Sequence, residues 1–187
     1  EGAHLGKLGR AYLDLGDLKR AIQYLEQALV IDQEIGDKPG EGNDLGNLGN
    51  AYYQLGQVQK AIYCYEQVLV IHRESGDKRG EGADLGNLGI AYTDLGDVHK
   101  AISYHERALT VASEIGDRRG EGADLGNLGI AHAKLGDVHK AIEYYKRALV
   151  VAREIGDKRL EGNQLGNLGL VYLRLSRPRK TIEYYEQ

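Results

Sequence analysis

Histidines are the side chains of this chain best suited to bind a metal, and their spacing separates them. His99 and His139 hold the same position in successive 40-residue blocks, so a repeat fold would place them about one repeat apart. Ligands of one zinc ion lie at about 2 Å from it, which that separation forbids. The sequence therefore predicts no metal site among its six histidines, which are His4, His72, His99, His105, His132 and His139.

The carboxylates and nucleophiles of the chain do not indicate a catalytic site. One glutamate recurs at the first position of the blocks, as Glu41, Glu81, Glu121 and Glu161. A catalytic pair should break the repeat at one place, and these residues do not. Ser103, Ser113 and the single cysteine, Cys64, lack the base and the orienting group that an activated nucleophile needs. We therefore expect no enzymatic activity and no cofactor.

Composition narrows the class of partner. The net charge of −4 and the pI of about 5.9 argue against a general surface for nucleic acid or anionic lipid. No apolar run reaches the roughly 20 residues of a membrane helix, no signal peptide opens the chain, and one cysteine cannot form an internal disulfide. We expect a cytoplasmic protein without a nucleic-acid or membrane partner. Base stacking on the recurring tyrosines is a disfavoured alternative, because it calls for interleaved basic residues.

The whole chain is one sequence repeat. It aligns without gaps in blocks 1–40, 41–80, 81–120, 121–160 and a partial block 161–187, and the third and fourth blocks share 30 of 40 positions. Self-similarity at this period is typical of stacked repeats rather than of a globular core. We therefore expect a single array over residues 1–187.

Each block predicts two helices. In the third block the first helix has an apolar stripe of Leu85, Leu88, Tyr92 and Leu95. The second helix carries Val98, Ala101, Ile102, His105, Ala108, Leu109 and Ile115. Gly96 and Gly116 are placed to end these helices, and Asp97 and Asp117 to cap the helices that follow. Neither helix is apolar all round, so stacked neighbours must cover each stripe, which predicts an all-α solenoid.

Glycines inside the first helix call for an explanation. Gly86 and Gly89 each cost about 1 kcal/mol of helix stability relative to alanine. Because glycine has no Cβ, a neighbouring helix can approach its backbone closely. We therefore expect tight helix packing at these positions. A phosphate-binding loop is excluded, because the Gly80-Glu81-Gly82 run lacks the fingerprint spacing and no strand precedes it.

The pattern Leu88-Gly89, Tyr92, Ala101, His105 and Ala108 resembles the tetratricopeptide signature, and the match recurs in every block. The unit is 40 residues instead of 34 and lacks the terminal proline. This longer variant resembles the repeats of the partner-of-inscuteable family (the G-protein signalling modulators), bacterial arrays and, more distantly, kinesin light chains. The resemblance implies a right-handed α-α superhelical solenoid whose inner groove grips extended segments of partner proteins.

The resemblance also bears on the ligand. Inner-helix asparagines of the partner-of-inscuteable family and of kinesin light chains contact the peptide backbone. Asn47, Asn87, Asn127 and Asn167 match that position, whereas Lys7 departs from it. The arginine that often precedes the first stripe leucine is replaced by Ala3, Asn43, Ala83, Ala123 and Asn163. These departures argue against an inscuteable-like acidic ligand, and the basic residues of a carboxylate clamp are not reproduced.

The face of the first helix opposite its apolar stripe is the predicted binding surface. Amide side chains both donate and accept hydrogen bonds, so an asparagine ladder can bind an extended backbone. Bridging between repeats or contact with water alone is the alternative. Ile90, Ile130 and Leu170 form an apolar row on the same face, to be explained by a ligand or by helix packing. The predicted groove comprises Asn47, Asn50, Tyr53, Asn87, Ile90, Asn127, Ile130, Lys134, Asn167, Leu170 and Arg174.

The predicted function is a protein–protein interaction scaffold that binds a peptide segment of a partner. Two alternatives stay open: self-assembly through stacked terminal repeats, and a role as sensor arm of a larger bacterial signalling protein. The chain begins and stops inside the pattern, so we expect a piece of a longer protein. The last helix is cut short, so we also expect an exposed apolar face that permits end-to-end self-association.

Overall fold

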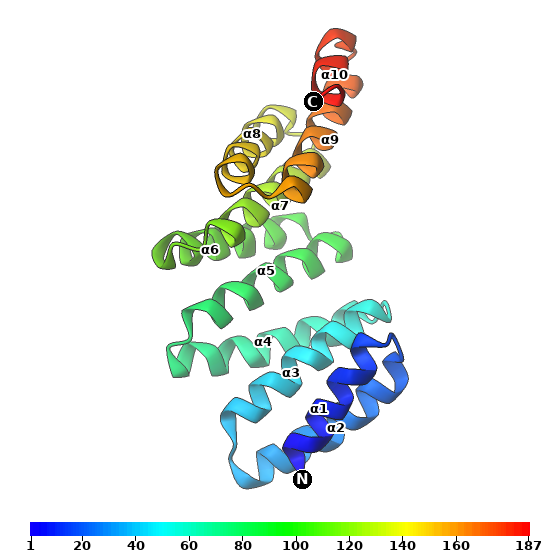
Figure 1. Cartoon of the computed structure of the whole chain (residues 1–187), viewed down its shortest axis with the longest axis vertical. Helices are drawn as coiled ribbons and strands as arrows, with labels where there is room; N and C mark the ends of the chain where they lie inside the picture. Colours follow the sequence, from blue (N-terminus) through cyan, green and yellow to red (C-terminus); the bar gives the residue numbers. More distant parts are fainter. The chain divides into compact units, whose positions relative to one another are not determined.

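The computed structural model describes all 187 residues and contains ten α-helices and no strand, which confirms the all-α repeat prediction (Figure 1). The chain divides into two compact units, Glu1–Leu95 and Gly96–Gln187. The division falls between the two helices of the third sequence block. Each unit is described by itself, and continuity of the array over residues 1–187 stays a prediction.

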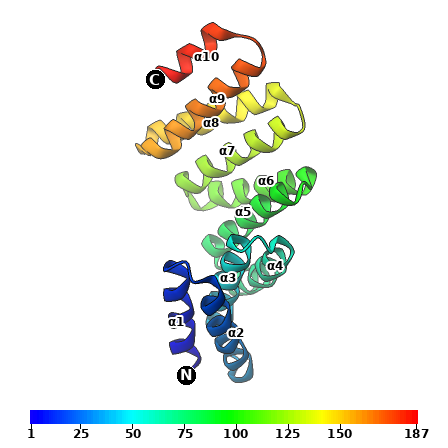
Figure 2. The same ribbon diagram turned by 90° about the vertical axis from the view of Figure 1, so that its right-hand side faces the viewer.

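The first unit holds five helices in antiparallel succession. These are α1 (Gly2–Asp14), α2 (Leu18–Ile35), α3 (Lys38–Gln54), α4 (Val58–Ser75) and α5 (Lys78–Leu95). Each helix packs against the next along the chain, and α1 also packs against α3 (Figure 2). The odd-numbered helices are the first helices of their repeats, and two of them, α1 and α3, pack against each other.

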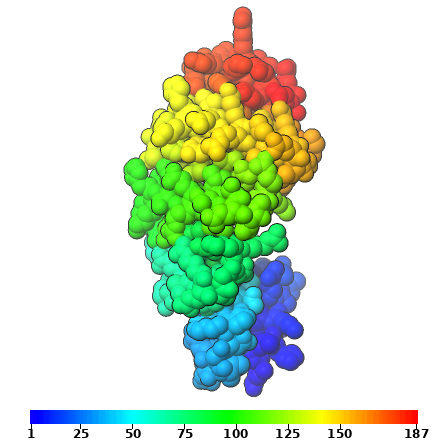
Figure 3. All heavy atoms as spheres, turned by 90° about the vertical axis from the view of Figure 1, so that its left-hand side faces the viewer, coloured from blue at the N-terminus to red at the C-terminus, as the bar shows by residue number.

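The second unit repeats this arrangement. It holds α6 (Val98–Ile115), α7 (Arg118–Lys134), α8 (Val138–Ile155), α9 (Lys158–Arg174) and α10 (Pro178–Tyr185). The atoms of α8, yellow in the space-filling view, lie directly against those of α7 and α9 (Figure 3). None of the chain's helices combines the length and the apolarity needed to cross a membrane.

Helix ends follow the predicted signals. Gly116 adopts the left-handed conformation (φ 69°) at the end of α6, and the Asp117 side chain then accepts a hydrogen bond of 3.0 Å from the Gly120 amide. Asp97 caps α6 in the same way, at 3.2 Å from the Lys100 amide. Because the cap is the aspartate, each first helix begins about three residues before the block boundary used for the alignment.

Close packing is observed at some helix glycines and not at others, since a Cβ on Gly46 or Gly166, which match Gly86, would meet nothing within 4 Å. A Cβ on Gly49 would lie 2.5 Å from the Tyr65 ring, and one on Gly129 would lie 2.5 Å from the Tyr145 ring. In these two repeats the second helix therefore packs a tyrosine ring against the bare backbone of the first helix. This contact offsets the helix propensity that glycine loses.

The apolar stripe of the first helix is buried over most of its length. Leu85, Leu88 and Tyr92 are buried, as the pattern predicts. Leu95 and Ile115 are exceptions, with exposed fractions of 42% and 39%. Leu95 is the last residue of α5, and Ile115 is the last residue of the second helix, α6. The periodicity was extrapolated one turn too far.

Candidate functional site

The first part of the predicted groove lies in the first unit, between α1 and α3. Asn47, Asn50 and Tyr53 line a cavity of about 570 Å³ together with Arg10 and Asp14 of α1. Arg10 and Asp14 form an exposed ion pair at 3.5 Å. The cavity therefore has amide, phenol and charged groups on its walls, which suits a polar extended chain.

Two of these residues also have structural partners. The Tyr65 hydroxyl donates a hydrogen bond of 2.9 Å to Asn50 Oδ1. The Tyr53 hydroxyl donates to Asp94 of α5, and burial together with this bond raises the pKa of Tyr53 to about 12. Asn50 can still offer its amide N–H groups to a ligand, whereas its oxygen already serves the core.

One asparagine of the predicted ladder stands on each first helix from the second repeat onward. Asn47 and Asn87 lie on α3 and α5 of the first unit, and Asn127 and Asn167 on α7 and α9 of the second. All four side chains are half-buried. Their contact with a ligand stays a prediction.

The apolar row is not uniform. Ile90 and Leu170 are exposed, with fractions of 36% and 43%. Ile130 is half-buried and packs against the core cluster that contains Tyr145 and Leu168. Packing therefore accounts for part of the Ile130 surface. Lys134 and Arg174 are exposed at the carboxyl ends of α7 and α9.

The repeated glutamates form ion pairs that tie the helices together. Glu81 accepts hydrogen bonds from Lys78 at 2.9 Å and from Arg73 at 2.8 Å, and these bonds lower its pKa. Glu161 makes the same two contacts with Lys158 and Arg153, each at 2.8 Å. Their repetition reflects a structural role at the start of each first helix.

A row of buried polar side chains was missed by the sequence analysis. The fourth block position is buried in four successive repeats, as Asp44, Asp84, Asp124 and Gln164. This position lies one turn before a stripe leucine, such as Leu48, and so faces the core side of the helix. A polar residue recurring on the apolar face was the signal that could have revealed it.

Histidines from the preceding helix contact two of these carboxylates at hydrogen-bond distance. His72 Nδ1 lies 2.7 Å from Asp84 Oδ2, and His105 Nδ1 lies 2.9 Å from Asp124 Oδ1. Burial raises the pKa of both carboxyls, to about 6 for Asp84, and the histidine contacts oppose the rise. Each pair joins the second helix of one repeat to the first helix of the next.

Asp44 lacks such a partner. Its Oδ2 atom is buried and has no hydrogen-bond partner in the protein. Burial, together with the nearby carboxylates of Asp32 and Asp37, raises the pKa of Asp44 to about 7. The first inter-repeat junction therefore contains an acid where the later junctions contain a pair or a neutral amide.

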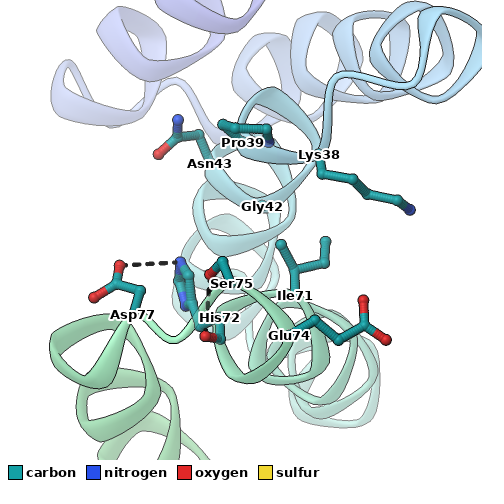
Figure 4. Close-up of a pocket in the computed structure, with 9 residues that line it drawn as sticks. All are labelled: Lys38, Pro39, Gly42, Asn43, Ile71, His72, Glu74, Ser75 and Asp77. Carbon is teal, nitrogen blue, oxygen red and sulfur yellow. Dashed lines mark hydrogen bonds and ion pairs between the residues drawn. The ribbon is translucent and has the colours of Figure 1, made fainter.

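A second cavity of about 470 Å³ lies between the start of α3 and the end of α4 (Figure 4). His72 stands on its wall, with Nε2 3.9 Å from Asp77 Oδ2. The Ser75 hydroxyl donates to the His72 carbonyl oxygen at 3.1 Å, and not to the imidazole. The His72–Asp84 pair therefore activates no serine nucleophile in this arrangement.

A third hollow, of about 360 Å³, lies on the side of the first unit where α2 and α4 meet α3. Tyr52 and Cys64 line it. At the matching positions of the first repeat, Tyr12 and Tyr24 stack with ring centroids 5.4 Å apart. Cys64 is too small to fill that place, so the substitution leaves an apolar hollow beside the Tyr52 ring.

Comparison with known proteins identifies the family. A tetratricopeptide repeat model matches residues 1–74, 83–154 and 122–187, so the chain belongs to the tetratricopeptide repeat family. A search of curated protein sequences gives no match.

Solved structures share the fold. A signal transduction ATPase with a tetratricopeptide repeat sensor from Pyrococcus horikoshii is 24% identical, with a TM-score of 0.90. The match covers 99% of this chain and 29% of that protein. A putative kinesin light chain from Podosopora anserina is 22% identical with a TM-score of 0.82, covering 99% and 91%. A Rap protein complexed with competence and sporulation factor is 20% identical with a TM-score of 0.79, covering 95% and 50%.

Proposed function

We propose that this protein is a non-catalytic interaction scaffold that binds an extended segment of a partner protein along the asparagine-bearing faces of its first helices. The observation that carries the proposal is the cavity of about 570 Å³ in the first unit, where Asn47, Asn50 and Tyr53 meet Arg10. An extended chain has unpaired N–H and C=O groups at regular intervals, and amide side chains can pair with both.

The relatives are consistent with this class of function. The Pyrococcus horikoshii protein is described as carrying a repeat sensor, and the Rap protein was solved with a bound factor. At these sequence identities the similarity supports a shared fold only. The ligand of this chain therefore has to be inferred from its own side chains. A cytoplasmic location and the absence of a nucleic-acid partner also stay predictions from the sequence.

The test is selection of a random-peptide display library on the purified chain. Asn47→Ala combined with Asn87→Ala removes the ladder from the first unit, and Asn127→Ala combined with Asn167→Ala removes it from the second. These changes spare Asn50 and Ile130, whose side chains the core uses. Enriched peptides should lose at least about tenfold in affinity to one or both variants, which is about 1.4 kcal/mol.

A matched control removes exposed side chains from second helices instead. Gln23→Ala combined with Ser103→Ala changes two exposed residues of α2 and α6. The control should bind the enriched peptides like the parent chain. If no peptide enriches, or if the ladder variants bind as the control does, the groove is not a peptide site.

Self-association through terminal repeats is a separate prediction. Leu170 and Leu173 of α9 and Ile182 of α10 are exposed apolar side chains in the second unit. Sedimentation velocity over a range of protein concentrations tests it, with Leu173→Lys as the variant that should abolish any concentration dependence. A sedimentation coefficient that does not change with concentration would reject it.

A further inference from the structure

The buried polar residue between repeats has a histidine partner or carries no charge at every junction but the first. Asp84 has His72, Asp124 has His105, and the fourth member of the row is the neutral Gln164. Asp44 is the acidic member of this row whose buried Oδ2 has no partner. A buried carboxylate without a cation is costly, so the exception calls for an explanation.

The first block replaces the compensating base with a second acid. Asp32 occupies in α2 the block position that His72 occupies in α4. Asp32 and Asp44 are only 3% and 4% exposed, and burial, together with Asp37, raises the pKa of Asp32. The exchange turns a junction with one acid and one base into a junction with two acids.

Both carboxylates line one cavity of about 430 Å³ between α1 and α3. Glycines leave the room that the carboxylates occupy. A Cβ on Gly6 would lie 2.6 Å from Asp44 Oδ1, and a Cβ on Gly40 would collide with Asp32. The two acids are therefore shielded from bulk water but remain on the wall of an open space.

Other charges at this cavity are already engaged or exposed. Arg10 is paired with Asp14 at 3.5 Å, and the Asp37 side chain caps α3 at 3.1 Å from the Gly40 amide. Lys7 also lines the cavity, and its side chain is exposed. Lys7 is therefore a cation of the protein that could compete for the site, as is the amino terminus, whose charge opposes the rise in the pKa of Asp32.

We propose that this cavity binds a cationic side chain of the partner, the ammonium of a lysine or the guanidinium of an arginine, between Asp32 and Asp44. The proposal rests on the proposed function and names the chemistry of one anchor of the bound segment. Asp44 lines the cavity and its Oδ2 has no partner in the protein, so the carboxylate keeps acceptor capacity for a charge-assisted hydrogen bond to an N–H donor. A bound metal is a poorer match, because no group of three or more acidic, histidine or cysteine side chains is placed to hold one.

The direct test uses n-butylammonium, which is the lysine side chain without its backbone. It is titrated into the full chain at about pH 8 and constant ionic strength, where Asp44 is mostly ionised. Saturable NMR shifts are expected at the Gly6, Gly40 and Asp44 amides. Tetramethylammonium is the matched probe, because it carries the same charge but no N–H donor. Equal shifts with both probes, or no saturable shift with either, would overturn the proposal.

Variants locate the site. Asp44→Asn and Asp32→His should each weaken n-butylammonium binding at least about tenfold, the second because it supplies the internal base that His72 supplies to Asp84. Glu34→Gln removes an equal charge from an exposed position of α2 and should bind like the parent. Binding that appears only after Lys7→Met would overturn the proposal, because the protein's own lysine would then fill the cavity.

Peptide selection separates this inference from the proposed function. Peptides enriched on the parent chain but lost on Asp44→Asn should share a lysine or arginine at one fixed position. Replacing that residue by norleucine or citrulline should remove the difference between the parent and Asp44→Asn. If peptides bind the asparagine ladder and ignore Asp44, the scaffold function stands and the cation site fails.

Discussion

The helices α2–α4 of the first unit and α6–α8 of the second are built on one 40-residue pattern. They differ in a buried polar contact between repeats and in an aromatic contact within a repeat. In the second unit, His105 is fully buried and lies 2.9 Å from Asp124. In the first unit, Leu25 stands at the position of His105, and Asp44 lacks a partner. The same backbone thus accepts either a buried histidine–carboxylate contact or an acid without a partner that faces a cavity.

The aromatic contact between the two helices of a repeat shows the same contrast. His132 and Tyr144 stack in α7 and α8, with ring centroids 5.3 Å apart. At the matching place Tyr52 faces Cys64, and a hollow of about 360 Å³ remains. In this repeat fold, a side chain that lacks the partner its equivalents have in other repeats indicates the chemistry of a ligand that could bind there.

The largest expected effect comes from removing the histidine of the His105–Asp124 pair. His105→Ala leaves Asp124 buried without its base and creates a cavity, so the free energy of unfolding should decrease by about 3 kcal/mol. Urea denaturation measures it. Adding Asp124→Asn should recover part of the loss. A double variant no more stable than the single one would mean that the cavity, and not the charge, dominates.

At the first junction, removing the charge of the buried residue should instead increase the free energy of unfolding. Asp44 binds its proton more tightly in the folded chain, with a pKa of about 7, than in the unfolded chain, where about 3.9 is usual. The contribution of Asp44 to the free energy of unfolding is therefore present at low pH and is lost as the pH rises from about 4 to about 7. Asp44→Asn should raise the free energy of unfolding by about 2 kcal/mol at about pH 8, and by less than half of that at about pH 5.

Thermal or urea unfolding at the two pH values, with Glu34→Gln as the charge-matched control, measures the difference. An Asp44→Asn variant that is less stable than the parent at about pH 8 would show that the carboxylate is compensated inside the protein after all.

A smaller effect should follow from exchanging the aromatic contact. Cys64→Tyr places a ring beside Tyr52 in the hollow and should raise the free energy of unfolding by about 1 kcal/mol. The reverse change, Tyr144→Cys, should lower it by a similar amount. Cys64→Ala is the control for loss of the thiol alone. If Cys64→Tyr is neutral while Tyr144→Cys destabilises, the hollow does not accept a stacked ring.

The smallest effect concerns the turn between the two helices of a repeat. Gly136 follows α7 with a φ of 81°, whereas Ser176 holds the matching position after α9 with a φ of 54°. Side chains disfavour this left-handed region, so Ser176→Gly should raise stability by about 0.5 kcal/mol, and Gly136→Ser should lower it. Differential scanning calorimetry on the two variants checks both signs. Equal melting temperatures would mean that Ser176 is not strained.

Much of the fold could be predicted because its signals are local. Glycine and aspartate at the turns, as at Gly116 and Asp117, act on the backbone within a few residues and are repeated in each block. The apolar stripe gives the helices and the need for stacked neighbours. At the ends, such as Leu95, the same periodicity was wrong, because burial there depends on how far the next helix extends.

The sequence by itself determined the helical repeat, its period and the face that carries Asn47 and its equivalents. The tertiary structure decided which side chains of different repeats meet. Asp44 and Asp84 are the same letter at the same block position, yet one faces Asp32 and the other His72. That difference arises from contacts between helices 12 residues or more apart in the chain, which no local pattern encodes, and it separates a closed core pair from a candidate binding site.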